Sequence, residues 1–95
     1  MVIGYCKAQF SAQWVTSLKE KRMVVKSIIE KTKHKFNVSV AEIDKQDIHQ
    51  TIVIGFACVS NDSVHTEKVI NTVLEYMENN TDATLDDEEI DILIV

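Results

Sequence analysis

The chain has 95 residues, of which 45% are hydrophobic and 26% are charged, and its formal net charge at pH 7 is −5. This length admits one domain with one core over residues 1–95, and the composition excludes a disordered chain. No stretch approaches the roughly 18 apolar residues of a membrane-spanning helix, and residues 1–7 lack the pattern of a signal peptide, so we expect a cytoplasmic protein.

Cysteine and histidine show no pattern of a metal or redox site. Cys6 and Cys58 lie inside apolar stretches, without a CxxC or Cys/His spacing, so we expect free, buried thiols. His34, His49 and His65 share no ligand spacing and are predicted to lie at the surface. Because no catalytic motif is present either, the sequence predicts a protein that is not an enzyme and that holds no metal or other cofactor.

Charge is unevenly distributed along the chain. Residues 1–50 hold nine Lys or Arg against five Asp or Glu, whereas residues 51–95 hold one against ten. Seven of the ten Lys and Arg residues fall within residues 17–36. This polarity allows a local basic patch to meet nucleic acid while the far side of the protein repels it.

The first third of the chain predicts a strand and a helix. Residues 2–10 alternate as a half-buried strand does. Ser17 is followed by Glu20, the spacing of a capping box, so a helix is expected to begin there, with Asn37 as its end. The helix has one stripe of residues to bury. This stripe consists of Leu18, Val24, Val25, Ile28, Ile29, Thr32 and Phe36.

The middle of the chain predicts two more strands. From Val38, β-branched residues favour a strand to Ile43, with Glu42 in an exposed position and a turn at DKQD. Residues 50–59 are apolar on both faces, which is typical of a strand in the middle of a sheet. Gly55 in this strand indicates a bulge or a close backbone contact.

A second helix and a fourth strand complete the pattern. Asn61, Asp62 and Ser63 supply capping side chains, and the helix is expected to end at ENNTD. Its apolar stripe consists of Val69, Ile70, Val73, Leu74 and Met77. Residues 89–95 alternate at their start and predict the last strand, preceded by an acidic turn over residues 86–89.

The order βαββαβ predicts an α+β protein with the ferredoxin-like fold. Two such split units form a four-stranded antiparallel sheet in the order 4-1-3-2, with both helices on one face. The other face is expected to be open and partly apolar, which would suit a homodimer or another homo-oligomer. On this open face we place Tyr5, Lys7, Gln9, Val53, Gly55, Ala57 and Leu93.

The first helix carries a basic ridge. Lys19, Arg22, Lys26 and Lys33 fall within about 60° of one another on a helical wheel. Glu30 lies in the same arc and weakens the ridge. Two interpretations are open: a solvated helix face, or a surface whose cations contact the phosphates of RNA without sequence specificity.

Lys21 and Trp14 each allow two interpretations. Lys21 projects toward the apolar side of the helix, so either its stem snorkels past the core edge or its ammonium group serves a site. Trp14, the only tryptophan, lies in the loop before the basic helix. It forms either a hydrophobic lid over the helix start or a platform on which a nucleobase stacks.

Activities hosted by this fold require residues that are missing here. An RNA-recognition motif needs aromatic residues on the open face, where only Tyr5 is expected. A metal chaperone would place CxxC in the first loop, and an acylphosphatase would place an arginine there. Residues 11–16 contain neither, and the single arginine is Arg22.

Several stretches together resemble a known family. They are SLKEKR at 17–22, KFNVSVAE at 35–42, Asp47 and ACVSND at 57–62. In this combination the chain resembles the YlxP-like family, small bacterial proteins of unknown function. The resemblance implies a ferredoxin-like fold, and the neighbourhood of family genes with translation and ribosome-maturation genes implies work on RNA. Family members often have Pro-Gly where this chain has Gln13 and Trp14, so the conformation of this loop is not carried over.

These observations predict a nonenzymatic accessory protein that associates with RNA or a ribosomal subunit. The predicted nucleic-acid-binding residues are Lys19, Arg22, Lys26, Lys33 and Trp14. The alternative is a homo-oligomeric protein-binding module that uses the open sheet face. Under either interpretation, we expect neither a membrane nor a metal ion as a partner.

Overall fold

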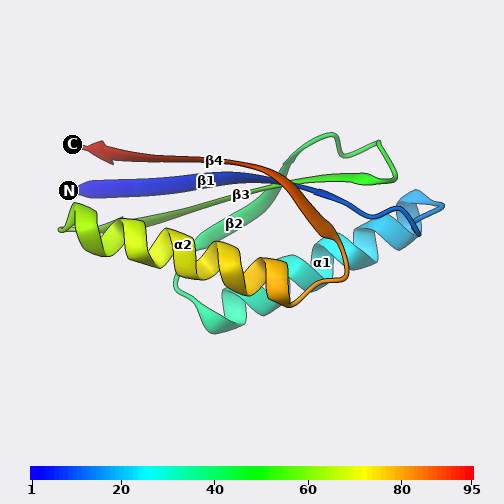
Figure 1. The fold of residues 1–95 in the computed structure, drawn as a ribbon, viewed down its shortest axis with the longest axis horizontal. Helices are drawn as coiled ribbons and strands as arrows, with labels where there is room; N and C mark the ends of the chain where they lie inside the picture. Colours follow the sequence, from blue (N-terminus) through cyan, green and yellow to red (C-terminus); the bar gives the residue numbers. More distant parts are fainter.

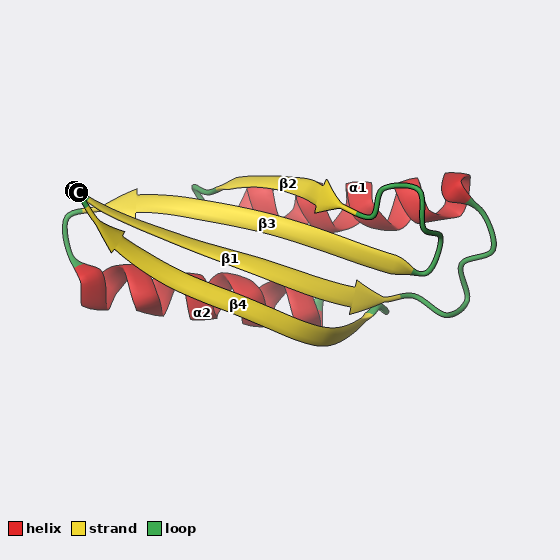
Figure 2. Cartoon of the chain, turned by 90° about the horizontal axis from the view of Figure 1, so that it is seen from above, coloured by secondary structure: helices red, strands yellow, loops and turns green.

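The computed structural model describes residues 1–95 and places the four strands side by side in the order β2-β3-β1-β4. Each neighbouring pair is antiparallel, and both helices lie on one side of the sheet (Figures 1 and 2). The predicted ferredoxin-like topology is thus confirmed. The elements are β1 (Val2–Ser11), α1 (Leu18–Lys35), β2 (Ser39–Asp44), β3 (Thr51–Ser60), α2 (Ser63–Asn79) and β4 (Thr84–Ile94).

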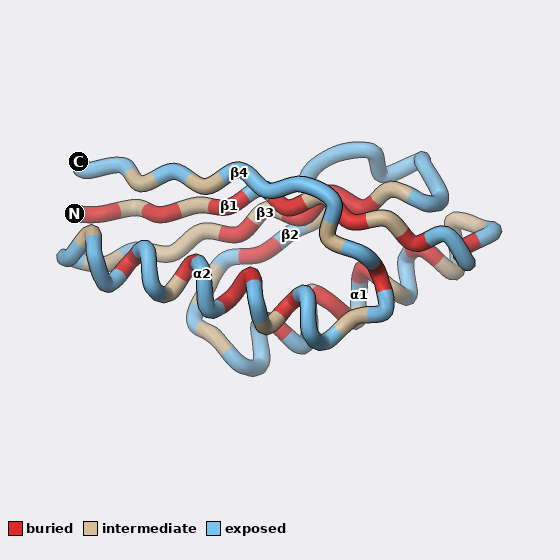
Figure 3. Tube along the Cα trace, in the orientation of Figure 1, coloured by how far each residue is buried: buried red, intermediate tan, exposed pale blue.

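Strand β1 is the centre of the sheet because it pairs with β3 on one side and with β4 on the other. The β1–β3 register runs from Val2 opposite Ser60 to Ser11 opposite Thr51, so the two strands match over their full length. Burial alternates along β1, as the sequence pattern predicted (Figure 3). Its helix-facing side chains are buried, and its other face is half-buried or exposed.

The core lies between the sheet and the two helices. Phe10, Ile52, Ile54 and Ile70 are fully buried in it. The predicted stripe of α2 is confirmed, since Ile70, Val73, Leu74 and Met77 are buried and Val69 is partly so. In α1 the buried positions are Lys21, Val25, Ile28 and Thr32, while the predicted Leu18 and Ile29 are half-buried.

The helix caps differ in detail from the predictions. Ser17 caps α1 through its Oγ, which accepts a hydrogen bond from the Glu20 amide at 3.1 Å. The reciprocal half of the capping box is absent, because the Glu20 carboxylate accepts from Thr16 Oγ1 at 2.8 Å instead. Helix α1 ends at Lys35, with Phe36 as its C-cap, rather than at Asn37. Asp62 caps α2 as predicted.

The predicted acidic turn at residues 86–89 is wrong, because these residues belong to β4. Strand β4 already begins at Thr84, and Glu88 and Glu89 pair with Ala8 and Lys7 of β1. Asp has a low strand propensity, but the long β1 offers backbone partners along its whole length. Since β4 is an edge strand, its carboxylates stay in water.

Lys21 and Glu42 form an internal ion pair between α1 and β2. The Lys21 side chain is 1% exposed, and its Nζ lies 3.1 Å from Glu42 Oε2 and donates a hydrogen bond to the Lys45 carbonyl. Glu42 faces the helices because it pairs with the helix-facing Ile54. The predicted exposure of Glu42 and the snorkelling of Lys21 are therefore wrong: the ammonium group is buried and ties α1 to β2.

Gly4 is the point of closest approach between β1 and α2. A Cβ atom at this position would clash with Ile70 Cδ1 and Thr66 Cγ2. We expect Gly4→Ala to lower the free energy of unfolding by about 1–3 kcal/mol because buried neighbours must shift. Gly55→Ala is the matched control, since its Cβ would meet the end of the Ile43 side chain at 2.9 Å, at a more exposed place. Urea denaturation measures both, and equal stability of Gly4→Ala and the parent would contradict this packing.

The ion pair of Lys21 predicts a non-additive pair of substitutions. Lys21→Met leaves Glu42 without its cation, and we expect a loss of about 1–3 kcal/mol, below the usual cost of breaking a fully buried pair because the Glu42 side chain is 19% exposed. In Lys21→Met/Glu42→Leu most of this loss should be recovered. Additive losses in urea denaturation of the three variants would show that the two side chains do not act together.

Candidate nucleic-acid interface

The structure brings the four predicted cations together on the outer side of α1. Lys19, Arg22, Lys26 and Lys33 are all exposed. The ridge has one ion pair, between Lys26 Nζ and Glu30 Oε1 at 3.9 Å, and these side chains are 75% and 65% exposed. Such an exposed pair neutralises little. Lys19, Arg22 and Lys33 have no carboxylate oxygen within 4 Å.

The acidic strand β4 lies at the opposite edge of the sheet. Helix α1 packs beneath β2, whereas α2 packs beneath β1, β3 and β4. Since β2 and β4 are the two outer strands, the basic helix and the acidic strand β4 are separated by the width of the sheet. The overall charge of −5 therefore does not cancel the positive potential beside α1.

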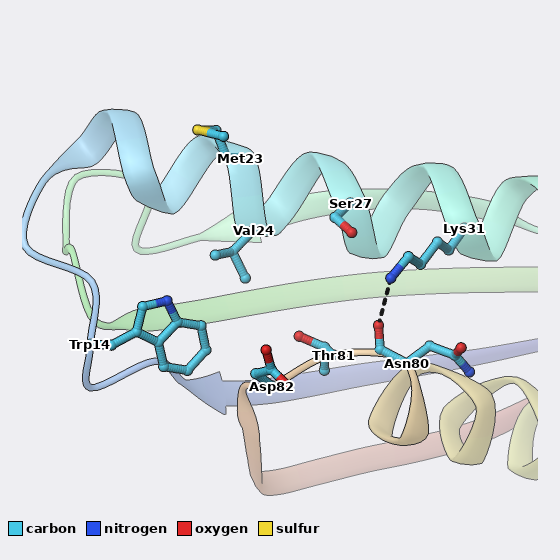
Figure 4. Close-up of a pocket in the computed structure, with 8 residues that line it drawn as sticks. All are labelled: Trp14, Met23, Val24, Ser27, Lys31, Asn80, Thr81 and Asp82. Atoms are coloured by element: carbon cyan, nitrogen blue, oxygen red, sulfur yellow. Dashed lines mark hydrogen bonds between the residues drawn. The ribbon is translucent and has the colours of Figure 1, made fainter.

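Trp14 lines a groove between α1 and the connection from α2 to β4. The groove has a volume of about 330 Å³, and the indole is 49% exposed. Figure 4 shows Trp14 facing Asp82, with Lys31 donating a hydrogen bond to the Asn80 carbonyl at 3.1 Å. The other lining residues are Met23, Val24, Ser27 and Thr81.

The groove and the basic ridge lie on different sides of α1. Ser27 and Lys31, which line the groove with Trp14, are roughly 110° and 150° around the helix axis from the centre of the ridge. Lys26 and Lys31 also line a shallow depression on the outer surface of α1, which connects the two sides. Sequence reasoning missed Lys31 because the second wall of the groove comes from residues 80–82, distant in sequence.

Two cysteine thiols and one lysine lie wholly or partly inside the fold. Burial, and to a smaller extent the Glu88 carboxylate, raises the pKa of the Cys6 thiol to about 11, so this thiol remains protonated at neutral pH. Burial also raises the pKa of Cys58, which is only half-buried. Lys21 is held inside by Glu42 and is not presented to a ligand.

Two further properties of the chain concern metal ions and membranes. No three His, Cys, Asp or Glu side chains are grouped so that they could hold a metal ion. Neither helix has both the length and the apolar character needed to cross a membrane.

The sequence and the fold are similar to those of known proteins. The family described as "Protein of unknown function (DUF503)" matches residues 3–90. The "Uncharacterized protein YlxP" of Bacillus subtilis (strain 168) is 40% identical over 78 residues, which cover 82% of this chain and 85% of that protein. A solved structure, "De novo designed protein Foldit4", is similar in fold, with a TM-score of 0.50, 15% identity, and coverage of 99% of this chain and 97% of that one. The chain is therefore a member of the YlxP-like DUF503 family.

Proposed function

We propose that this protein is a nonenzymatic, cytoplasmic accessory protein that binds RNA, alone or within a ribosomal subunit, through α1. One observation carries the proposal: three of the four ridge cations have no counter-charge within 4 Å, although Asp and Glu outnumber Lys and Arg in the chain by fifteen to ten. Unpaired cations on one helix face attract a polyanion, and the acidic edge of the sheet orients the protein so that α1 approaches first.

In this proposal, the ridge supplies affinity and the groove holds a base. The phosphates of the RNA are contacted by Lys19, Arg22, Lys26 and Lys33. These contacts fix the position of the RNA without reading its sequence. On the other side of α1, the half-exposed Trp14 offers an aromatic face for one unpaired base. Lys31 lines both the groove and the depression on the outer surface of α1. It therefore lies where the RNA backbone would pass from the ridge to the base that stacks on Trp14.

Reversal of the ridge charges tests the proposal. We expect Lys19→Glu/Arg22→Glu/Lys26→Glu/Lys33→Glu to abolish binding of a fluorescein-labelled single-stranded RNA, measured by anisotropy. In the parent protein, four contacts predict a slope near −2.8 for log affinity against log salt, from about −0.7 per phosphate. Quenching of Trp14, the only tryptophan, should accompany binding.

A pair of variants with equal charge controls this experiment. Arg22→Glu/Lys26→Glu changes the net charge as much as Lys45→Glu/Lys68→Glu, which lies outside α1. The first pair should weaken binding strongly and the second only slightly. Retained binding in the fourfold variant, with the helix content unchanged in circular dichroism, would refute the proposal.

A second candidate function is a homo-oligomeric module that associates through the open sheet face. It is supported by an apolar hollow of about 360 Å³ on that face, beside Gly55 and Ala57. Val53, which we also placed on this face, is only 1% exposed and is not available for a contact. Val53 pairs with Asp44 at the end of β2, and the connection from β2 to β3 that follows rises above the strands in Figure 1.

Ala57→Asp tests this second function because a carboxylate would be forced into the proposed contact. We expect an oligomer formed through the face to dissociate into monomers in sedimentation equilibrium. Ala57→Ser, which places an uncharged group at the same position of β3, is the control for strand stability. An oligomer that persists in the Ala57 variant would place the contact elsewhere.

A further inference from the structure

The open face of the sheet is uncovered, and its side chains can be placed in rows across the strands. Figure 2 looks onto this face, with the helices behind the strands. One row holds Ser39, Ala57, Tyr5 and Asp91. The next holds Ala41, Gly55, Lys7 and Glu89. The face therefore changes from small and apolar at β2 and β3 to charged at β4.

The apolar half of the face contains a hollow. Gly55 has no side chain, so the floor of the hollow is backbone, and the Ile43 side chain leans over it from β2. Ala41, Ala57 and Tyr5 line it further, and the charged Lys7 and Glu89 border it on the side of β4. The hollow is large enough to receive an apolar side chain that projects from a partner.

The apolar surface continues to one end of the sheet. There, Val59, Ile3 and Leu93 lie in one row across β3, β1 and β4. Val59 is 66% exposed and Leu93 is 44% exposed. A strip of apolar surface thus runs along the strands from the hollow to this row, and nothing within the chain covers it.

The charged half of the face is a column of carboxylates on β4. Asp87, Glu89 and Asp91 are exposed and lie opposite Gln9, Lys7 and Tyr5 of β1, so all three project to the open side. Alternate residues of a strand are about 7 Å apart. Lys7 is the only Lys or Arg in the four strands and forms no ion pair within 4 Å.

The column produces a negative potential on this face. Partial burial, followed by the charges of Asp91 and Glu89, raises the pKa of the Tyr5 phenol. Two copies of this face placed against each other would each bring three carboxylates and one ammonium group. Like charges across an interface are costly, so a cationic partner is a more favourable occupant of this face than a second copy.

We propose that the open face binds a cationic amphipathic helix of a partner protein. The helix would lie along the strands over β1, with apolar side chains toward the hollow and Lys or Arg side chains toward Asp87, Glu89 and Asp91. The dimensions agree: β3 and β4 are two strand spacings apart, about 10 Å, which is close to the diameter of a helix. Residues i and i+4 of a helix are about 6 Å apart, close to the spacing of the column.

This site is independent of the proposed RNA-binding surface. The residues proposed to bind RNA belong to α1, which lies behind the sheet in Figure 2, and to the loop before it, which extends beyond the end of β1. A partner helix on the open face would leave α1 exposed. Binding of one ligand therefore does not require the other, and failure of either proposal leaves the other in place.

Titration with a designed peptide tests the inference. The probe is an amphipathic helix of Leu and Lys, and its counterpart has Glu in place of Lys. Added to the ¹⁵N-labelled full chain, the Lys peptide should shift the amide signals of Gly55, Ala57 and Glu89 in NMR spectra. The Glu peptide should leave them unchanged.

Two sets of variants separate specific docking from general attraction to an acidic protein. Asp87→Asn/Glu89→Gln/Asp91→Asn should weaken binding of the Lys peptide at least tenfold. Glu67→Gln/Glu75→Gln/Glu78→Gln removes three exposed carboxylates of α2 and should change binding less than twofold. Ala41→Asp, on the edge strand β2, should weaken binding by blocking the hollow without altering a central strand.

Three outcomes would overturn the inference. The α2 variant could weaken binding as much as the β4 variant. The attraction would then depend on the net charge of the protein alone and not on the column of β4. The amide shifts could fall outside the sheet. Sedimentation of the protein alone could show a dimer that Ala57→Asp dissociates, in which case a second copy occupies the face.

Discussion

The double pairing of β1 is the constraint on which the rest of the structure depends. Because β1 is bonded to β3 and to β4 along its length, its backbone is satisfied and its two faces are fixed by the alternation of its side chains. The face toward the helices must then accommodate α2 at close range, which requires Gly4 and small neighbours such as Ala8. A slip of one residue would bring Lys7 into the core.

This constraint also separates the charges. Seven of the ten Lys and Arg lie on α1, and five of the fifteen Asp and Glu lie on β4, at the two edges of the sheet. Among the cations of α1, Lys21 differs because its charge is matched by Glu42 of β2. The molecule therefore presents positive charge on α1, behind the edge formed by β2, and negative charge along the opposite edge, formed by β4. This arrangement gives a polyanion and a cationic protein different places to bind.

Much of the fold could be predicted from the sequence because its signals are local. Ser17 and Asp62 mark the helix starts, and the uninterrupted apolar run of β3 indicates a central strand. The errors arise where a distant partner overrides local preference. Asp86 and Asp87 look like turn residues until β1 is beside them, and Glu42 looks exposed until Lys21 lies above it.

Only part of the candidate site could be predicted from the sequence. The ridge of α1 follows from helical spacing within a single element, so its four residues could be named in advance. The surroundings of Trp14 could not, because residues 80–82 reach the groove only through the packing of α2 against α1. The carboxylate column was hidden for a similar reason, since its side chains align only once β4 is known to extend to Thr84.

The burial of Lys21 makes one amine in this protein chemically distinct. Every other lysine side chain is exposed, so amine-specific reagents reach all of them in the folded state. Lys21 is reached only when α1 lifts from β2, and its labelling rate therefore reports how often that local opening occurs. The labelling rate of this one lysine thus measures how often the helix that carries the basic ridge separates from the sheet.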